Sequence, residues 1–249
     1  MKEDFPYPRN LIVRRVVRCL TFPAFWLLSK FHIHGKDNLP ESGPLLVVAN
    51  HFSFIDPVAI VRALPYPLEY LGGAEFPHAP KIVQSLPKLY GYYPVYRGTG
   101  SRYALRAAEA ILEKNGVIGI LPEGGSWAEV LRPARPGAAY LASRTGAMIL
   151  PLGIYGLNDI FPLQPGHRPD VHVRIGKPFG PFQVTGRGQT RREQLDEIGL
   201  TIMKRIAALL PDPFRGFLAT DPDHRAAAEG TEKYPWDDKV EGEVDGEVH

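Results

Sequence analysis

Apolar and polar residues are arranged along the chain in blocks that predict strands and helices in turn. Short apolar stretches, many of them rich in β-branched or aromatic residues, predict strands at 32–35, 44–49, 68–71, 92–96, 117–121, 147–155 and 171–175. Segments with helical spacing or helix-end signals predict helices at 58–64, 79–89, 101–114, 136–144 and 190–210. This alternation predicts an α/β fold, a single domain in which helices flank a mainly parallel, mixed central sheet.

The N-terminal segment 1–33 has a different pattern, which predicts amphipathic helices at a membrane interface. A basic stretch precedes an aromatic one, with Arg14, Arg15 and Arg18 followed by Phe22, Phe25 and Trp26. The longest uncharged run, 19–29, is shorter than the roughly 20 apolar residues that span a bilayer. Pro23 predicts a break into two short helices. The alternative is an amphipathic helix packed on the protein's own core.

Composition and charge narrow the class of protein. The 249 residues suffice for one sizeable domain, and the single cysteine, Cys19, excludes an intramolecular disulfide and fits a reducing compartment. Residues 1–220 carry a net charge of +9 and residues 221–249 a net charge of −7. The basic part suits an anionic partner, and the polar, acidic stretch 219–249 predicts a mobile tail. We therefore expect a domain at 34–218 attached peripherally or monotopically to the cytoplasmic face of the cell membrane.

The candidate chemistry begins with His51 and Asp56. His51 follows the predicted strand 44–49, and Asp56-Pro57 has the features of a helix start, with an N-cap carboxylate before a proline. The short loop between them allows the carboxylate to meet the imidazole, and a histidine held by an aspartate can act as a general base. The simpler interpretation is that Asp56 is only an N-cap and His51 only a residue at a strand end.

Three more clusters fall at predicted strands. Arg97 follows the strand 92–96, where it could hold an anion or form a surface ion pair. Glu123 and Gly124 follow the strand 117–121; there Glu123 could orient a hydroxyl and glycine N–H groups could approach an oxyanion, or the segment could be only a turn. The apolar strand 147–155 could line an acyl pocket, although plain core suits most of its residues better.

In this order the clusters resemble the lysophospholipid acyltransferase family, the 1-acylglycerol-3-phosphate acyltransferase-like enzymes. The resemblance runs from about residue 33 to 216 and rests on motifs that match, in chain order, the family's H-x4-D box (His51–Asp56), its G-x5-R box (Gly91–Arg97), its P-E-G box (Pro122-Glu123-Gly124) and its apolar box (Ile149–Ile154). It implies transfer of a fatty acyl group from acyl-CoA or acyl carrier protein to a lysophospholipid hydroxyl in phospholipid biosynthesis. No metal or cofactor is implied, and the partners are membrane lipid and the acyl donor.

The resemblance also assigns roles to single residues. His51 would remove the hydroxyl proton, with Asp56 supporting the imidazolium. Backbone amides near Glu123 and Gly124 would hold the oxyanion, or Glu123 would bind the acceptor polyol. Arg97 would hold the acceptor phosphate.

The chain departs from the family at one point. Gly125 and Ser126 stand where the family often has Thr and Arg, which removes a cation from the expected phosphate site. Arg135 occupies the place of a common family lysine, and Arg132 is close in sequence, so these two could compensate. The acceptor could otherwise be a glycolipid or another lysolipid without phosphate.

Other classes of function are compatible with parts of the sequence. The protein could be a thioesterase or lipase. The sequence lacks the G-x-S-x-G elbow of such hydrolases, but hydrolysis by a histidine-activated water stays open. A non-enzymatic binder of anionic membranes would explain residues 1–36, which carry seven basic and two acidic side chains, but not the clusters at strands. No nucleic-acid partner is expected, because no reading motif is recognisable.

Overall fold

The structure, a computed structural model, describes residues 4–73, 87, 89–95 and 102–233. A seven-stranded sheet forms its centre, in the order β1-β7-β6-β2-β5-β3-β4. The strands are β1 (Lys30–His34), β2 (Leu45–Ala49), β3 (Glu69–Gly73), β4 (Tyr92–Val95), β5 (Val117–Ile120), β6 (Met148–Tyr155) and β7 (Asp170–Ile175). Neighbours pair in parallel except β6 and β7, so the predicted α/β fold with a mainly parallel, mixed sheet is confirmed.

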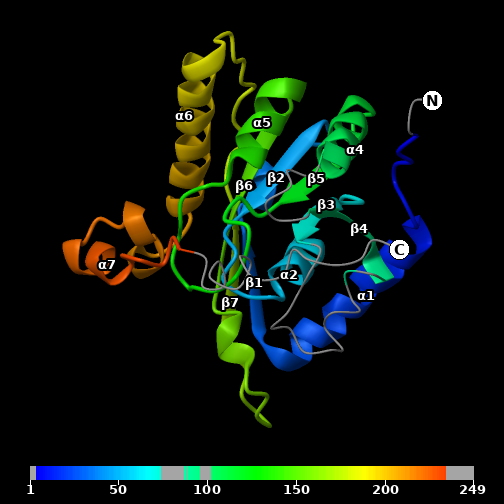
Figure 1. Cartoon of the computed structure of the whole chain (residues 1–249). Helices are drawn as coiled ribbons and strands as arrows, with labels where there is room; N and C mark the ends of the chain where they lie inside the picture. The colour runs from blue at the N-terminus through cyan, green and yellow to red at the C-terminus, as the bar shows by residue number, and fades with distance from the viewer. Residues whose placement is uncertain (1–3, 74–86, 88, 96–101, 234–249) are drawn as a thin grey trace, which may run out of the picture.

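Helices cover both faces of this sheet (Figure 1). They are α1 (Leu11–Leu28), α2 (Asp56–Ala63), α4 (Arg102–Glu113), α5 (Pro136–Thr145), α6 (Gly188–Ala207) and α7 (Pro222–Ala227), with short 3-10 turns at Lys36–Asn38, Asn158–Ile160, Asp212–Phe214 and Gly216–Leu218. The helix expected at 79–89 lies almost entirely outside the described residues.

The central strand β2 shows why the sheet needs cover on both sides. All five of its residues are buried, and they contribute alternately to two apolar clusters. Leu46 and Val48 belong to the cluster under α4, α5 and α6, whereas Leu45, Val47 and Ala49 belong to the cluster under α1 and α2. A strand that is apolar throughout is typical of a parallel sheet with helices on both faces.

The N-terminal segment differs from the expectation of two short helices. α1 is one helix with Pro23 inside it. Pro23 removes one backbone hydrogen bond, but it lies on the exposed side of α1, where the orphaned Cys19 carbonyl can reach water. β1 follows directly and pairs with β7, so the expected domain boundary at 33/34 falls inside a strand of the central sheet.

The side chains of α1 also differ from the sequence-based prediction in which of them are buried and which are exposed. Arg14 is buried rather than facing a membrane, and its Nη2 lies 2.6 Å from Glu69 Oε2. The opposite side of α1 exposes an apolar face, formed by Ile12, Val16, Leu20, Phe22, Trp26 and Leu27. Among the described residues, no helix combines the length and the apolar character needed to cross a membrane.

The C-terminal residues differ from the expected mobile tail over part of their length. Residues 219–233 contain α7, and Ala219 and Ala228 are buried. Asp221 caps α7 by accepting a hydrogen bond from the Asp223 backbone N–H. The acidic remainder, 234–249, lies outside the described residues.

Candidate active site

His51 lies just beyond the end of β2, in the short loop that leads to α2. The residue before it, Asn50, extends the sheet by one position with its side chain: Nδ2 donates to the Ile154 carbonyl and Oδ1 accepts from the Ile154 N–H, both at 2.7 Å. A side-chain amide can imitate a backbone amide in this way, and both of its polar atoms are satisfied although Asn50 is fully buried. The chain therefore leaves the sheet at a defined point directly before His51.

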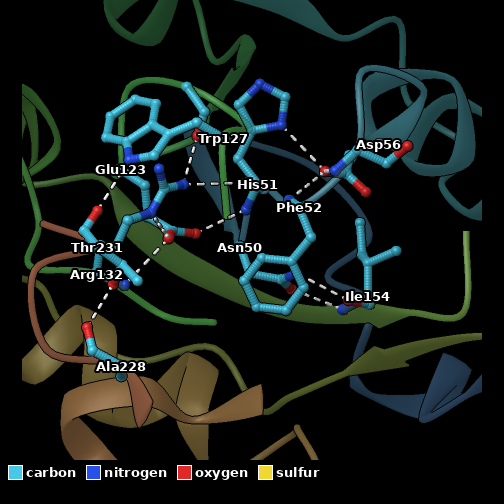
Figure 2. Close-up of polar contacts among 12 residues, drawn as sticks. Asn50, His51, Phe52, Asp56, Glu123, Trp127, Arg132, Ile154, Ala228 and Thr231 are labelled. Carbon is cyan, nitrogen blue, oxygen red and sulfur yellow. Dashed lines mark hydrogen bonds and ion pairs between the residues drawn. The ribbon is translucent and has the colours of Figure 1, made fainter. Parts of the chain in front are cut away.

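Asp56 holds the imidazole of His51. Asp56 Oδ2 lies 3.0 Å from His51 Nδ1 and also accepts the backbone N–H groups of Phe52 and Ser53 at 2.8 Å. The hydrogen bond expected between the two side chains is thus present (Figure 2). With Nδ1 donating to the carboxylate, Nε2 keeps its lone pair for a substrate proton. Asp56 is the first residue of α2 rather than its N-cap, and its carboxylate turns back onto the loop instead of capping the helix.

Glu123 supports His51 from the opposite side. Its side chain is fully buried; Oε1 accepts the His51 backbone N–H at 2.7 Å, and Oε2 lies 2.9 Å from Arg132 Nε. Burial raises the pKa of Glu123 to about 7, while Arg132 and the His51 N–H act to lower it. Glu123 is a candidate for binding the acceptor polyol, but its side chain is fully buried and its two carboxylate oxygens already accept hydrogen bonds from His51 and Arg132.

Arg132 completes the support of the His51 backbone. Its Nη2 donates to the His51 carbonyl at 3.1 Å and to the Gly125 carbonyl, while its backbone N–H donates to Glu123 Oε2 at 3.1 Å. Glu123 and Arg132 therefore bind the N–H and the C=O of one residue, His51 (Figure 2). Arg132 is 2 % exposed, so of the two arginines that could compensate for the missing family arginine only Arg135 is exposed.

His51 opens onto an apolar cavity of about 220 Å³. Its wall comes from α1, from α2 and from the carboxyl ends of the central strands, with Val17, Phe54, Val58, Val61, Leu71 and Leu121 among the aliphatic and aromatic lining residues. None of the described lining residues is Asp, Glu, Lys or Arg. A histidine on the wall of an apolar cavity, held by a carboxylate, suits a substrate with a hydrocarbon chain and a reactive group near one end.

Of the remaining predicted site residues, Gly124 lines the cavity, Arg135 lies beside Gly124, and Arg97 lies outside the described residues. Gly124 lines the cavity with a φ of +79°, and its N–H donates to the Leu121 carbonyl at 3.1 Å. Arg135 is exposed, and its Cγ lies 3.4 Å from the position that a Cβ on Gly124 would occupy. Arg97, the residue expected to hold a phosphate, lies outside the described residues.

Two supporting residues were missed or misjudged from the sequence. Asn50 had a usable signal, because it is a polar residue directly continuing a buried apolar run. Arg132 had none, because only the fold brings its guanidinium to the His51 carbonyl, 81 positions away in sequence. In the part of the chain that the structure describes, no group of three or more His, Cys, Asp or Glu side chains is placed to bind a metal ion.

Comparison with known proteins agrees with this geometry. The family model described as Acyltransferase matches residues 30–155, which include His51, Asp56, Glu123 and Arg132. The chain belongs to the acyltransferase family. The resemblance inferred from the four motifs is thereby confirmed.

One relative and one solved structure are similar to this chain. The chain is 27% identical over 142 residues to a 1-acyl-sn-glycerol-3-phosphate acyltransferase of Borreliella burgdorferi, a match that covers 55% of this chain and 56% of the relative. It thus spans about half the length of that relative. The crystal structure of the 1-acyl-sn-glycerophosphate (LPA) acyltransferase PlsC from Thermotoga maritima aligns with a TM-score of 0.53 and 21% identity, covering 79% of this chain and 82% of that one. This second match shows that the two share a fold.

Proposed function

We propose that the protein transfers a fatty acyl group from the thioester of acyl-CoA or acyl carrier protein to the hydroxyl of a lysophospholipid of the 1-acylglycerol-3-phosphate class. The observation that carries the proposal is the hydrogen bond from Asp56 to His51, whose side chain lines an apolar cavity. Family membership supports the reaction type, and the names of the two similar proteins support the acceptor class.

The proposed mechanism uses the geometry around His51 directly. Nε2 takes the proton of the acceptor hydroxyl as the oxygen attacks the thioester carbonyl carbon, and Asp56 stabilises the imidazolium through Nδ1. The tetrahedral intermediate then collapses, the C–S bond breaks, and the departing thiolate takes the proton from the imidazolium. His51 returns to its starting state, and no acyl group is ever attached to the enzyme.

A second candidate acceptor is a lysolipid or glycolipid without a phosphate. It is favoured by the absence of charged side chains from the described cavity wall and by Gly125 and Ser126 in place of the family's Thr and Arg. Arg135 beside Gly124 supports the phosphorylated acceptor instead, because a cation at the mouth can attract a phosphate that stays in water while the acyl chain is buried.

We further propose that α1 attaches the protein to a membrane surface. Trp26 is 70% exposed and Ile12 78%, and large apolar side chains gathered on one helix face need a cover that the described residues do not supply. Val17, on the other side of α1, lines the cavity. A lipid leaving the membrane at α1 would therefore have a short path to His51.

Mass spectrometry of the products from acyl-CoA and a panel of phosphorylated and neutral lysolipids tests the reaction. We expect a diacyl product that depends on the acceptor. Free fatty acid formed at the same rate with and without acceptor would instead indicate a hydrolase, and no consumption of thioester would contradict the enzymatic proposal.

The choice of acceptor is tested with Ser126→Arg, which restores a cation beside Gly124. One charge-assisted contact contributes roughly 1.5–3 kcal/mol, so the KM for a phosphorylated acceptor should fall roughly tenfold to a hundredfold. The KM for a neutral acceptor serves as the control. An unchanged KM for both acceptors would favour the acceptor without phosphate.

Membrane attachment is tested by flotation with liposomes that contain anionic lipid. Leu20→Glu, in the exposed face of α1, should reduce the fraction of protein bound to liposomes. Leu200→Glu, the same substitution at an exposed leucine of α6, is the control and should not. Equal binding of the two variants would show that α1 is not the attachment surface.

A further inference from the structure

The side chain of Arg132, which holds the His51 carbonyl, is itself covered by Trp127. The Arg132 guanidinium carbon lies 3.9 Å from the centroid of the Trp127 ring. The indole Nε1–H of Trp127 donates to the Thr231 carbonyl at 2.8 Å (Figure 2). One chain of contacts thus leads from Thr231, which follows α7, to the backbone of His51, through Trp127, Arg132 and the Glu123 carboxylate.

The segment that carries Thr231 is held against the active-site loop at other points as well. The Phe214 carbonyl accepts the Leu131 backbone N–H at 2.9 Å, directly before Arg132. The Phe214 ring stacks on Phe52, the residue after His51, with centroids 6.1 Å apart. Gly216 packs so closely on Leu131 that a Cβ would meet the Leu131 carbonyl oxygen at 2.0 Å. Residues 211–233 therefore contact the residues on either side of the His51 support.

The same segment is also braced internally. Asp212 accepts the backbone N–H groups of Thr220 and Asp221 at 2.8 and 3.1 Å, and His224 Nδ1 lies 2.9 Å from its Oδ2. Arg225 donates to the carbonyls of Ala219 and Thr220. These bonds tie α7 to the turns before it, so Thr231 is presented to Trp127 by a folded unit rather than by a loose chain end.

We propose that residues 211–233 act as a brace, and that Trp127 and Arg132 are positioning residues through which this brace fixes His51 for acyl transfer. The inference rests on the proposed function for its kinetic consequence, but its structural content does not depend on that function. Residues 211–233 lie outside the range 30–155 that the family model matches.

The proposal predicts a graded loss of turnover. Trp127→Phe keeps a ring over Arg132 but cannot donate to Thr231, whereas Trp127→Ala removes both contacts. A displacement of about 1 Å at a reacting group can cost on the order of a hundredfold in rate. We therefore expect kcat to fall roughly tenfold to a hundredfold in Trp127→Ala and less in Trp127→Phe, with KM for acyl-CoA unchanged. Glu232→Gln, on an exposed residue next to Thr231, is the control and should retain wild-type kcat.

A second measurement is independent of activity. In protein labelled with ¹⁵N-histidine, the hydrogen exchange of the His51 amide reports its bond to Glu123, and the amides of His32 and His172 in the distant strand pair β1 and β7 provide internal controls. Trp127→Ala and Arg132→Lys should each speed exchange at His51 about tenfold while leaving His32 and His172 unchanged.

The outcomes separate the two proposals. If the wild-type protein transfers no acyl group but Trp127→Ala and Arg132→Lys still speed exchange at His51, the brace is supported and the proposed function is contradicted. Active enzyme in which Trp127→Ala changes neither kcat nor His51 exchange would overturn the brace alone. Loss of kcat only in proportion to the loss of folded protein, measured by thermal unfolding, would also overturn it, because a purely structural contact behaves in that way.

Discussion

Two loops hold His51, and they differ in how far along the sequence their supporting residues lie from it. The loop to Asp56 spans five positions, and one carboxylate oxygen there accepts the imidazole and two backbone N–H groups. The support from Glu123 and Arg132 binds the backbone of His51 from 72 and 81 positions away. The first support orients the imidazole, which we propose acts as the base, whereas the second fixes the position of the His51 backbone. A sequence motif reveals the first kind of support far more readily than the second.

The largest effect should come from the imidazole itself. Loss of a general base typically costs on the order of a hundredfold to ten-thousandfold in rate, so His51→Ala should lose most or all acyl transfer. His34→Ala, at an exposed histidine, is the control, and thermal unfolding should show that both variants remain folded. Near-normal transfer by His51→Ala would contradict the role of the imidazole as base.

The backbone support should matter more for stability. Glu123→Leu leaves the Arg132 charge buried without its carboxylate, and breaking a buried pair in this way costs roughly 3–5 kcal/mol of folding free energy. Chemical denaturation measures the loss. The double variant Glu123→Leu/Arg132→Met should recover much of it, and Glu113→Leu, at an exposed carboxylate, should change little. A single-variant loss no larger than that of Glu113→Leu would remove the case for a supporting ion pair.

Asn50 supports the start of the His51 loop through a neutral side chain. Asn50→Ala leaves the N–H and C=O of Ile154 without the partners seen here, and unsatisfied buried groups cost about 1–3 kcal/mol. Urea denaturation should show a loss of that size in the free energy of unfolding, and KM should change little. No change in the denaturation midpoint would mean that the Asn50 side chain is not needed to end β2.

A further effect should be a pH dependence that belongs to Glu123. Its pKa is about 7 in the folded protein against 4.5 for a free side chain, because burial disfavours the charged form. The folded state therefore binds this proton more tightly, and its contribution to stability is present below pH 4.5 and is lost as the pH rises through 7. The slope is at most about 1.4 kcal/mol per pH unit.

The free energy of unfolding measured between pH 5 and pH 8 should therefore fall more steeply in the wild type than in Glu123→Gln. Parallel curves would show that burial does not shift the pKa of Glu123 as described.

The sequence alone determined the strands, the fold class, the family and the pair His51–Asp56. The strands followed from runs of apolar residues, because a buried strand such as β2 needs apolar side chains on both faces. The pair followed because its two members are joined by a loop so short that the local geometry brings them together. Information of this kind is carried by neighbours in the sequence.

Only the tertiary structure decided which polar residues are buried and which partners they meet. Arg14 looked like a surface cation of an interfacial helix, but Glu69 draws it into the interior. Arg132 and Glu123 looked like candidates for substrate binding, but they pair with each other behind His51. Residues 219–233 looked too polar to fold, yet Asp212 and Trp127 supply partners for their backbone. The burial of a charge depends on a partner distant in sequence, and composition and periodicity do not identify that partner.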